Sequence, residues 1–107
     1  MKFTDFLEEQ GLLQYVSRFP SIRYTEDIMS YETLENGFVI STKDETYRVV
    51  LSYDSETNKY DYIAEQLVND EFKLIPHSTY EEKCKQPLLT HHLGYSLVVR
   101  QLKKNHQ

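Results

Sequence analysis

The spacing of apolar residues changes along the chain, and the first segment has the period of a helix. Residues 4–19 place an apolar side chain at roughly every third or fourth position, which predicts an amphipathic helix. Thr4 is the expected N-cap, Gly11 is expected to divide the segment into two short helices, and Pro20 ends it. Residues 21–36 are polar without a regular period, so this part is expected to be irregular.

From Gly37 onward the period changes to two, which is the repeat of a half-buried strand. Tyr47, Val49 and Leu51 share one face of such a strand and more polar residues occupy the other face. Polar turns divide this part of the chain into four strands, which are expected at residues 37–42, 47–54, 60–68 and 71–75. Consecutive strands joined by short turns predict an antiparallel meander.

The last segment has the pattern of a helix, and Pro87 suits its first turn. Its expected inner face consists of residues at helical spacing, namely Leu88, His92, Tyr95, Val99 and Leu102. A strand is the competing prediction, because Tyr95, Leu97 and Val99 also alternate. We expect the helix.

Together these elements predict a single α+β domain over residues 1–107. It comprises an N-terminal helix, a four-stranded antiparallel meander, and a helical C-terminal segment packed on one sheet face. A meander alone would expose its apolar face to water, so the sheet needs the helices as a cover. Leu51 is expected in the resulting core, where an aspartate would unfold the domain.

Composition narrows the class of protein. Leu, Ile, Val and Phe make up about 27% of the 107 residues, which exceeds the roughly 20% below which chains tend to be disordered. Apolar runs reach only three residues, so a membrane span is not expected. The first residues become charged before a signal peptide could form, and the single cysteine excludes an internal disulfide. We therefore expect a cytoplasmic protein.

Charge is distributed unevenly within the net value of −5. Residues 24–71 hold 12 acidic and three basic side chains, whereas residues 72–107 hold two acidic and six basic ones. The expected sheet region therefore carries −9 and the C-terminal part +4. Such a sheet repels phosphate, so direct nucleic-acid binding is not expected at its acidic face. It attracts a basic protein surface instead, although the same carboxylates also serve solubility.

Tyrosine is abundant, with nine residues against five phenylalanines and no tryptophan. Several lie on or beside the predicted strands. A tyrosine has an apolar ring and a polar tip, which suits it to cross-strand packing or to a half-wet protein interface. Base stacking is the third use, but it normally occurs with lysine and arginine, and the neighbours here are acidic.

No constellation of residues predicts catalysis or a cofactor. Cys84, His77 and His91 match no familiar zinc spacing, and the adjacent His91 and His92 would point apart on a helix. Cys84 lies between two lysines that could lower its pKa, but no paired base is evident. The three glycines are scattered and form no phosphate-binding loop. We therefore expect no catalytic residue, no metal site and no cofactor.

One hairpin resembles a known family. Residues 39–51, followed by an acidic turn and by Tyr60 and Asp61, are similar to the central hairpin of phage-encoded anti-CRISPR proteins that inhibit Cas9. The residues that carry the similarity are Thr42, Lys43, Glu45, Tyr47, Val49 and Leu51. The resemblance implies a small acidic, non-enzymatic protein of phage or mobile-element origin that occupies a basic DNA-binding site. The rest of the chain does not match, so no functional residue is transferred.

The function that follows is a non-catalytic binding protein, an inhibitor or regulator that docks an acidic surface onto a basic, nucleic-acid-binding protein. The expected contact residues are acidic and tyrosine side chains of the predicted sheet and its turns, namely Asp44, Glu45, Asp54, Glu56, Asp61, Tyr47, Tyr53 and Tyr60. Two alternatives stay open. One is a ligand-binding or enzymatic domain with a pocket between sheet and helices, and the other is a dimeric regulator that binds nucleic acid through its basic C-terminal part.

Overall fold

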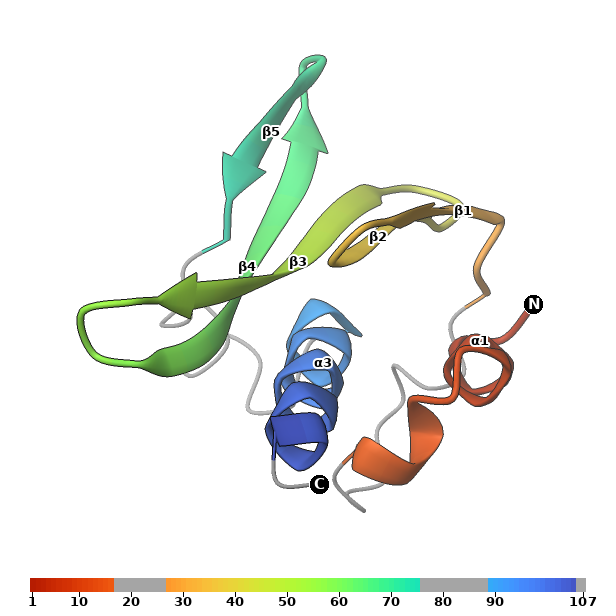
Figure 1. Ribbon diagram of the computed structural model, residues 1–107. Coiled ribbons are helices and arrows are strands. Elements are labelled where there is room, and N and C mark those ends of the chain that lie inside the picture. Colours follow the sequence, from red (N-terminus) through yellow and green to blue (C-terminus); the bar gives the residue numbers. More distant parts are fainter. Residues whose placement is uncertain (17–26, 76–88, 106–107) are drawn as a thin grey trace.

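A five-stranded antiparallel sheet covers a long C-terminal helix in the computed structural model, which describes residues 1–16, 27–75 and 89–105 (Figure 1). The strands follow the chain order β1-β2-β3-β4-β5. They are β1 (Ser30–Leu34), β2 (Gly37–Ser41), β3 (Thr46–Asp54), β4 (Lys59–Val68) and β5 (Glu71–Leu74). The helices are α1 (Phe3–Glu9), the 3-10 turn η1 (Leu13–Tyr15) and α3 (Leu89–Asn105). The predicted α+β class and the antiparallel meander are confirmed.

The sheet has one strand more than the pattern predicts. β1 lies within the segment expected to be irregular, and it pairs with β2 from Ser30 opposite Ser41 to Leu34 opposite Gly37. Four of its five residues are exposed and only Leu34 is half-buried. An edge strand pairs through its backbone on one side and needs no apolar alternation, which is why the strand was missed.

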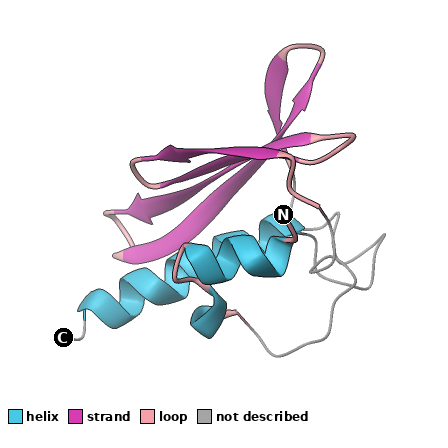
Figure 2. Cartoon of the chain, turned by 90° about the vertical axis from the view of Figure 1, so that its right-hand side faces the viewer, coloured by secondary structure: helices cyan, strands magenta, loops and turns pink. Residues whose placement is uncertain are grey.

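The two faces of the sheet differ in what covers them. The inner face rests on α3 and α1, while the other face, here called the outer face, carries no helix of the described residues (Figure 2). Alternation along each strand assigns residues to the two faces. Val49 on β3 pairs with Phe38 and Ala64 on the inner face, and the next residue, Val50, pairs with Gly37 and Ile63 on the outer face.

The N-terminal helix is shorter than expected and begins elsewhere. α1 begins at Phe3 with Lys2 as its N-cap, so Thr4 is not the cap that the pattern predicts. Gly11 follows the end of α1 and has a backbone φ of +71°, a conformation that glycine adopts readily. The backbone N–H of Leu12 then donates to the carbonyl of Leu7 at 2.8 Å. The predicted division of this segment near Gly11 is confirmed.

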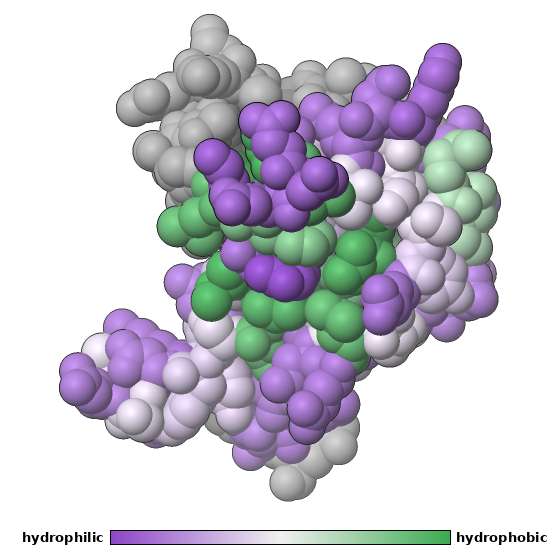
Figure 3. All heavy atoms as spheres, turned by 90° about the horizontal axis from the view of Figure 1, so that it is seen from above, coloured by the Kyte–Doolittle hydropathy of each residue, from purple (hydrophilic) through white to green (hydrophobic). Residues whose placement is uncertain are grey.

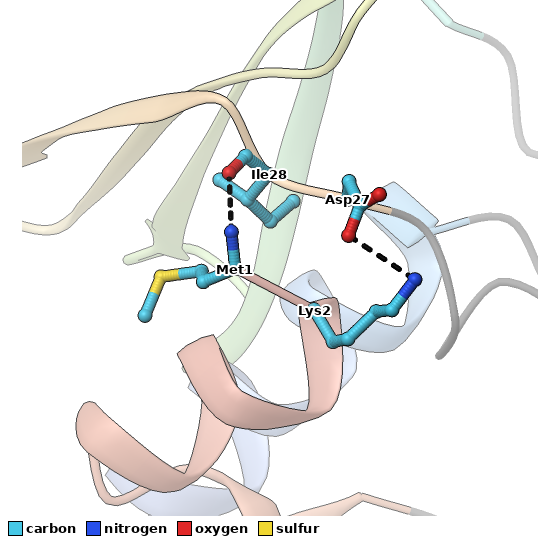
Figure 4. Close-up of polar contacts among 4 residues, drawn as sticks. All are labelled: Met1, Lys2, Asp27 and Ile28. Carbon is cyan, nitrogen blue, oxygen red and sulfur yellow. Dashed lines mark hydrogen bonds and ion pairs between the residues drawn. The ribbon is translucent and has the colours of Figure 1, made fainter.

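Contacts with the start of the chain hold α1 against the strand that follows. The terminal amine of Met1 donates to the carbonyl oxygen of Ile28 at 3.0 Å (Figure 4). The ammonium of Lys2 lies 3.2 Å from a carboxylate oxygen of Asp27, and the two residues form an isolated antiparallel bridge. Because Asp27 and Ile28 lead into β1, these contacts place α1 beside the sheet edge.

The core lies between the inner face and the helices. Phe6 packs edge-to-face on Phe38 and on Tyr31, with ring centroids 5.1 Å apart in both pairs. The fully or nearly fully buried apolar side chains come from α1, β2, β3, β4 and α3 and from the segments before η1 and β1, and they include Phe3, Leu7, Leu12, Ile28, Ile40, Val49, Ala64, Leu89, Leu93 and Leu97. Leu51 is half-buried and packs against this cluster, as expected.

Helix α3 presents a different face to the sheet from the one predicted. Leu89, Leu93 and Leu97 are buried, whereas Tyr95 and Leu102 are 47% and 43% exposed. His92 is buried as expected and Val99 is half-buried, so the prediction is wrong for Tyr95 and Leu102, while Leu88 lies outside the described residues. Small residues are the reason: a β-carbon at position 94 would lie 2.3 Å from the ring of Tyr62, so only glycine allows this close approach. Among the described residues, no helix is long and apolar enough to cross a membrane.

Candidate functional site

The structure divides the eight predicted contact residues between the two ends of β3. Asp44, Glu45 and Tyr47 lie at the β2–β3 turn or next to it, where β3 begins. The other five lie where β3 ends and β4 begins, namely Tyr53, Asp54, Glu56, Tyr60 and Asp61, and we call this group the β3–β4 tip. At about 3.3 Å per residue, the two groups are separated by roughly 25–30 Å. They are therefore two sites and not one patch.

The β3–β4 tip is an ordered hairpin end that extends past α3 (Figure 1). The rings of Tyr53 and Tyr60 pair across the strands with centroids 4.8 Å apart, and the hydroxyl of Tyr53 donates to the side-chain oxygen of Asn58. The carboxylate of Asp54 accepts the backbone N–H of Glu56 at 2.9 Å and so caps the turn. Glu56 and Asp61 are exposed, which leaves their carboxylates at the surface.

The acidic residues of the β2–β3 turn are partly engaged within the turn. The backbone N–H of Glu45 donates to the hydroxyl of Thr42 at 3.2 Å, and the hydroxyl of Tyr47 donates to the carboxylate of Glu45. Asp44 is exposed beside them. This turn thus uses Tyr47 and Glu45 to hold its own shape.

The outer face carries an apolar row that crosses four strands. The register places Leu34 opposite Gly37, Gly37 opposite Val50, and Val50 opposite Ile63, in a line at right angles to the strands. Leu34 and Val50 are half-buried and Ile63 is 39% exposed. Figure 3 shows this face from above, with apolar side chains gathered in its middle beside strongly hydrophilic atoms, and with further hydrophilic side chains around them. We call these four residues the apolar row.

A salt bridge lies next to the apolar row on the outer face. The guanidinium of Arg48 binds the carboxylate of Glu65 on the facing strand, with both N–O distances 2.8 Å. The same guanidinium lies 4.3 Å from the centre of the Phe72 ring, so it also makes a cation–π contact with β5. Arg48 is therefore neutralised and held flat against the sheet.

Carboxylates flank the apolar row on both sides. Glu32 lies on one side, next to Val39 and the Arg48–Glu65 pair, and Asp61 lies on the other side opposite Ser52. The charged residues of the whole outer face are Glu32, Arg48, Asp54, Lys59, Asp61 and Glu65, four acidic and two basic. The face is thus apolar in its middle and negative at its margin.

A separate group of titratable residues joins α3 to the inner face. The hydroxyl of Tyr62 and Nδ1 of His91 are hydrogen-bonded at 2.6 Å. Burial, with a smaller contribution from Asp61, raises the pKa of Tyr62 to about 12, so the phenol stays protonated. Burial and then the charge of His91 lower the pKa of His92 to about 4, so His92 is neutral at pH 7.

The alternative hypothesis of a ligand-binding or enzymatic domain expects a pocket between sheet and helices, with His92 and Tyr95 among its lining residues. The structure turns Tyr95 outward and packs Tyr62 directly on Gly94, which closes this part of the space between sheet and helix. In the part of the chain that is described, no three His, Cys, Asp or Glu side chains are grouped to hold a metal ion. His77 and Cys84 lie outside the described residues, as do Pro87 and Leu88.

Sequence reasoning missed the apolar row, although a signal for it was present. Val50 lies among Arg48 and Ser52 on the polar face of its strand, and Ile63 lies between Asp61 and Glu65. Each is a single apolar residue in a polar alternation, and only the register shows that they lie side by side.

Comparisons of the chain with protein-family models, curated proteins and solved structures find no match.

Proposed function

We propose that this chain is a non-catalytic binding protein, an inhibitor or regulator, which docks its outer face and β3–β4 tip onto a basic surface of a protein partner. One observation carries the proposal: an exposed sheet face has an apolar row at its centre and carboxylates on both sides of it. Protein interfaces commonly have an apolar centre within a polar, solvent-accessible rim.

The tyrosine pair of the β3–β4 tip supports the same role. Tyrosine is enriched in protein interfaces and among the residues that contribute most to binding. Tyr53 is 51% exposed although its ring packs on Tyr60. Because Tyr53 continues the alternation of Val49 and Leu51, the pair lies on the inner-face side, and a partner on the outer face covers it by reaching around the tip, with little loss of side-chain freedom. The tip and the outer face join at Asp54 and Asp61, which belong to both.

Charge indicates the chemistry of the partner. The segment over residues 24–71 carries −9, and its unpaired carboxylates attract a positively charged surface over about a Debye length, roughly 8 Å at physiological salt. A basic groove that grips nucleic acid is such a surface. The resemblance of residues 39–51 to Cas9-inhibiting anti-CRISPR proteins favours the same type of target.

The experiment compares two double charge reversals that change the net charge equally, from −5 to −1. Glu56→Lys/Asp61→Lys alters the proposed site and keeps Asp54, which caps the turn. Glu8→Lys/Glu9→Lys alters the last turn of α1, where basic residues suit the helix dipole. Partners are captured from host lysate at low and high salt, and their dissociation constants are measured.

We expect the first variant to lose the partner and the control to keep it, with weaker binding of the wild type at high salt. Equal binding of the wild type and Glu56→Lys/Asp61→Lys, with both folded, contradicts the proposal. Equal losses in both variants would contradict it as well, because net charge alone would then account for binding.

A further inference from the structure

The direction of the apolar row limits what shape of partner can lie on it. Along β3 the outer-face residues on either side of Val50 are Arg48 and Ser52, and along β4 those beside Ile63 are Asp61 and Glu65. A segment parallel to the strands would therefore meet a charged or polar side chain after each apolar one. A segment that crosses the strands meets the apolar side chains of Leu34, Val50 and Ile63 and the backbone of Gly37, and no charged side chain.

The spacing along the row fits the repeat of a helix. Neighbouring strands lie about 4.8 Å apart, so the row from Leu34 to Ile63 spans roughly 14 Å. One helical turn rises 5.4 Å, so residues at i, i+4, i+7 and i+11 follow the row about one per strand. An extended segment places same-face residues about 6.7 Å apart and loses register with the strands.

The carboxylates are spaced to face the two flanks of such a helix. Glu32 and Asp61 each lie two residues along a strand from the row, hence roughly 6–7 Å to either side of it. A helix with side chains is about 10–12 Å wide, so cationic residues on both of its flanks reach them. The Arg48–Glu65 pair lies on the Glu32 side of the row and adds no net charge there.

The β4–β5 end of the sheet limits the row on one side. In Figures 1 and 2 this hairpin stands up from β1–β3 on the side away from the helices. Its outer-face residues Leu67, Phe72 and Leu74 continue the apolar surface, and Arg48 contacts Phe72 there.

A second copy of this chain is a poorer occupant, because the negative margins of two outer faces would repel each other.

We propose that the outer face receives a basic amphipathic α-helix of the partner, lying across the strands along Leu34, Val50 and Ile63. This inference rests on the proposed function and specifies the partner element. The helix places its apolar stripe on the row and its lysine or arginine flanks at Glu32 and Asp61.

The test uses two labelled lysine/leucine peptides of equal composition and about 15 residues, which span roughly 22 Å as a helix. One repeats leucine on a single helical face, at i, i+3, i+4, i+7, i+8, i+11 and i+14, and the other alternates lysine and leucine, so that both contain the same number of leucines. Fluorescence anisotropy measures their binding to the wild type, to Ile63→Lys, and to Leu102→Lys. Ile63 and Leu102 are 39% and 43% exposed, and Leu102 lies on α3, so the second variant is a matched control.

We expect the helical peptide to bind the wild type roughly tenfold or more tightly than the alternating one, and Ile63→Lys to weaken it by a similar factor. Leu102→Lys should bind as the wild type does. Equal binding of the two peptides, or equal effects of the two variants, overturns the helix inference, whereas the charge reversals above test the proposed function separately. Self-association of the wild type that Ile63→Lys abolishes in sedimentation would instead identify a second copy as the occupant and overturn the inference.

Discussion

The ring of Tyr62 lies directly on the backbone of Gly94, and this contact sets how closely α3 approaches the sheet. A β-carbon at position 94 would lie 2.3 Å from two ring carbons of Tyr62, well inside any permitted contact. The hydroxyl of the same tyrosine reaches His91, one turn earlier on α3. The helix is thus positioned by a ring and a glycine at one point and by a hydrogen bond beside it.

We expect Gly94→Ala to destabilise the protein, although alanine favours helix by about 1 kcal/mol over glycine. The added methyl overlaps a rigid buried ring, and overpacking of this kind typically costs about 1–3 kcal/mol. Urea denaturation measures the free energy of unfolding. In a Tyr62→Ala background the cost should disappear, and an equal cost in both backgrounds would show that the ring is not the obstacle.

Leu51→Asp should abolish cooperative unfolding. Leu51 packs against the core opposite Tyr62, and an unpaired carboxylate there costs several kcal/mol out of a typical stability of about 5–15 kcal/mol. The matched control is Ser52→Asp, which changes the next residue on the outer face and should shift stability by less than about 1 kcal/mol. A Leu51→Asp melt close to the wild type would refute the assignment of faces in β3.

The buried His92 makes stability depend on pH in a defined window. Its pKa falls from 6.5 in the unfolded chain to about 4 in the folded one, so the unfolded state binds more protons between these values. Neutral His92 contributes fully to the free energy of unfolding above pH 6.5. As the pH falls towards 4, the free energy of unfolding decreases by on the order of 3 kcal/mol.

His92→Gln removes this titration and leaves the other groups in place. Subtracting its unfolding free energy from that of the wild type at each pH should give a difference that declines from pH 7 to pH 4. A difference that stays constant over this range would mean that the pKa of His92 is not lowered by folding.

The separation of the two acidic groups predicts unequal effects on association. Glu56→Lys/Asp61→Lys should slow association with the captured partner by roughly tenfold and flatten its salt dependence. Asp44→Lys/Glu45→Lys, roughly 25–30 Å away along β3, lies beyond a Debye length of about 8 Å and should change the rate little. Stopped-flow measurement of the association rates of both variants at two salt concentrations tests this. Equal changes of rate in the two variants would show that no single end of the sheet docks.

The meander was predictable because its inner residues alternate with polar ones. Phe38, Ile40, Val49 and Leu51 all repeat at a period of two, and short polar turns leave no other connection than antiparallel hairpins. β1 escaped prediction because Tyr31 and its neighbours are exposed at the sheet edge. Its place depends on pairing with β2 and on the contact of Tyr31 with Phe6, both of which join distant parts of the chain.

The candidate site was predictable in kind but not in arrangement. Composition and local charge indicated a negative surface with tyrosines, and five of the eight named residues do lie together at the β3–β4 tip. That Asp44 and Glu45 lie apart from them follows from the antiparallel order, because turns at the two ends of one strand cannot meet. The length of the predicted strand already implied this separation.

Local pattern alone determined that this chain forms helices, hairpins and an acidic sheet, because those properties depend on residues within a few positions of each other. Only tertiary structure decided that Leu34, Val50 and Ile63 form one row and that Gly94, not Tyr95, faces the sheet. Strand register and the closeness of helix packing depend on contacts between residues far apart in the chain. Such contacts leave little trace in the order of neighbouring residues.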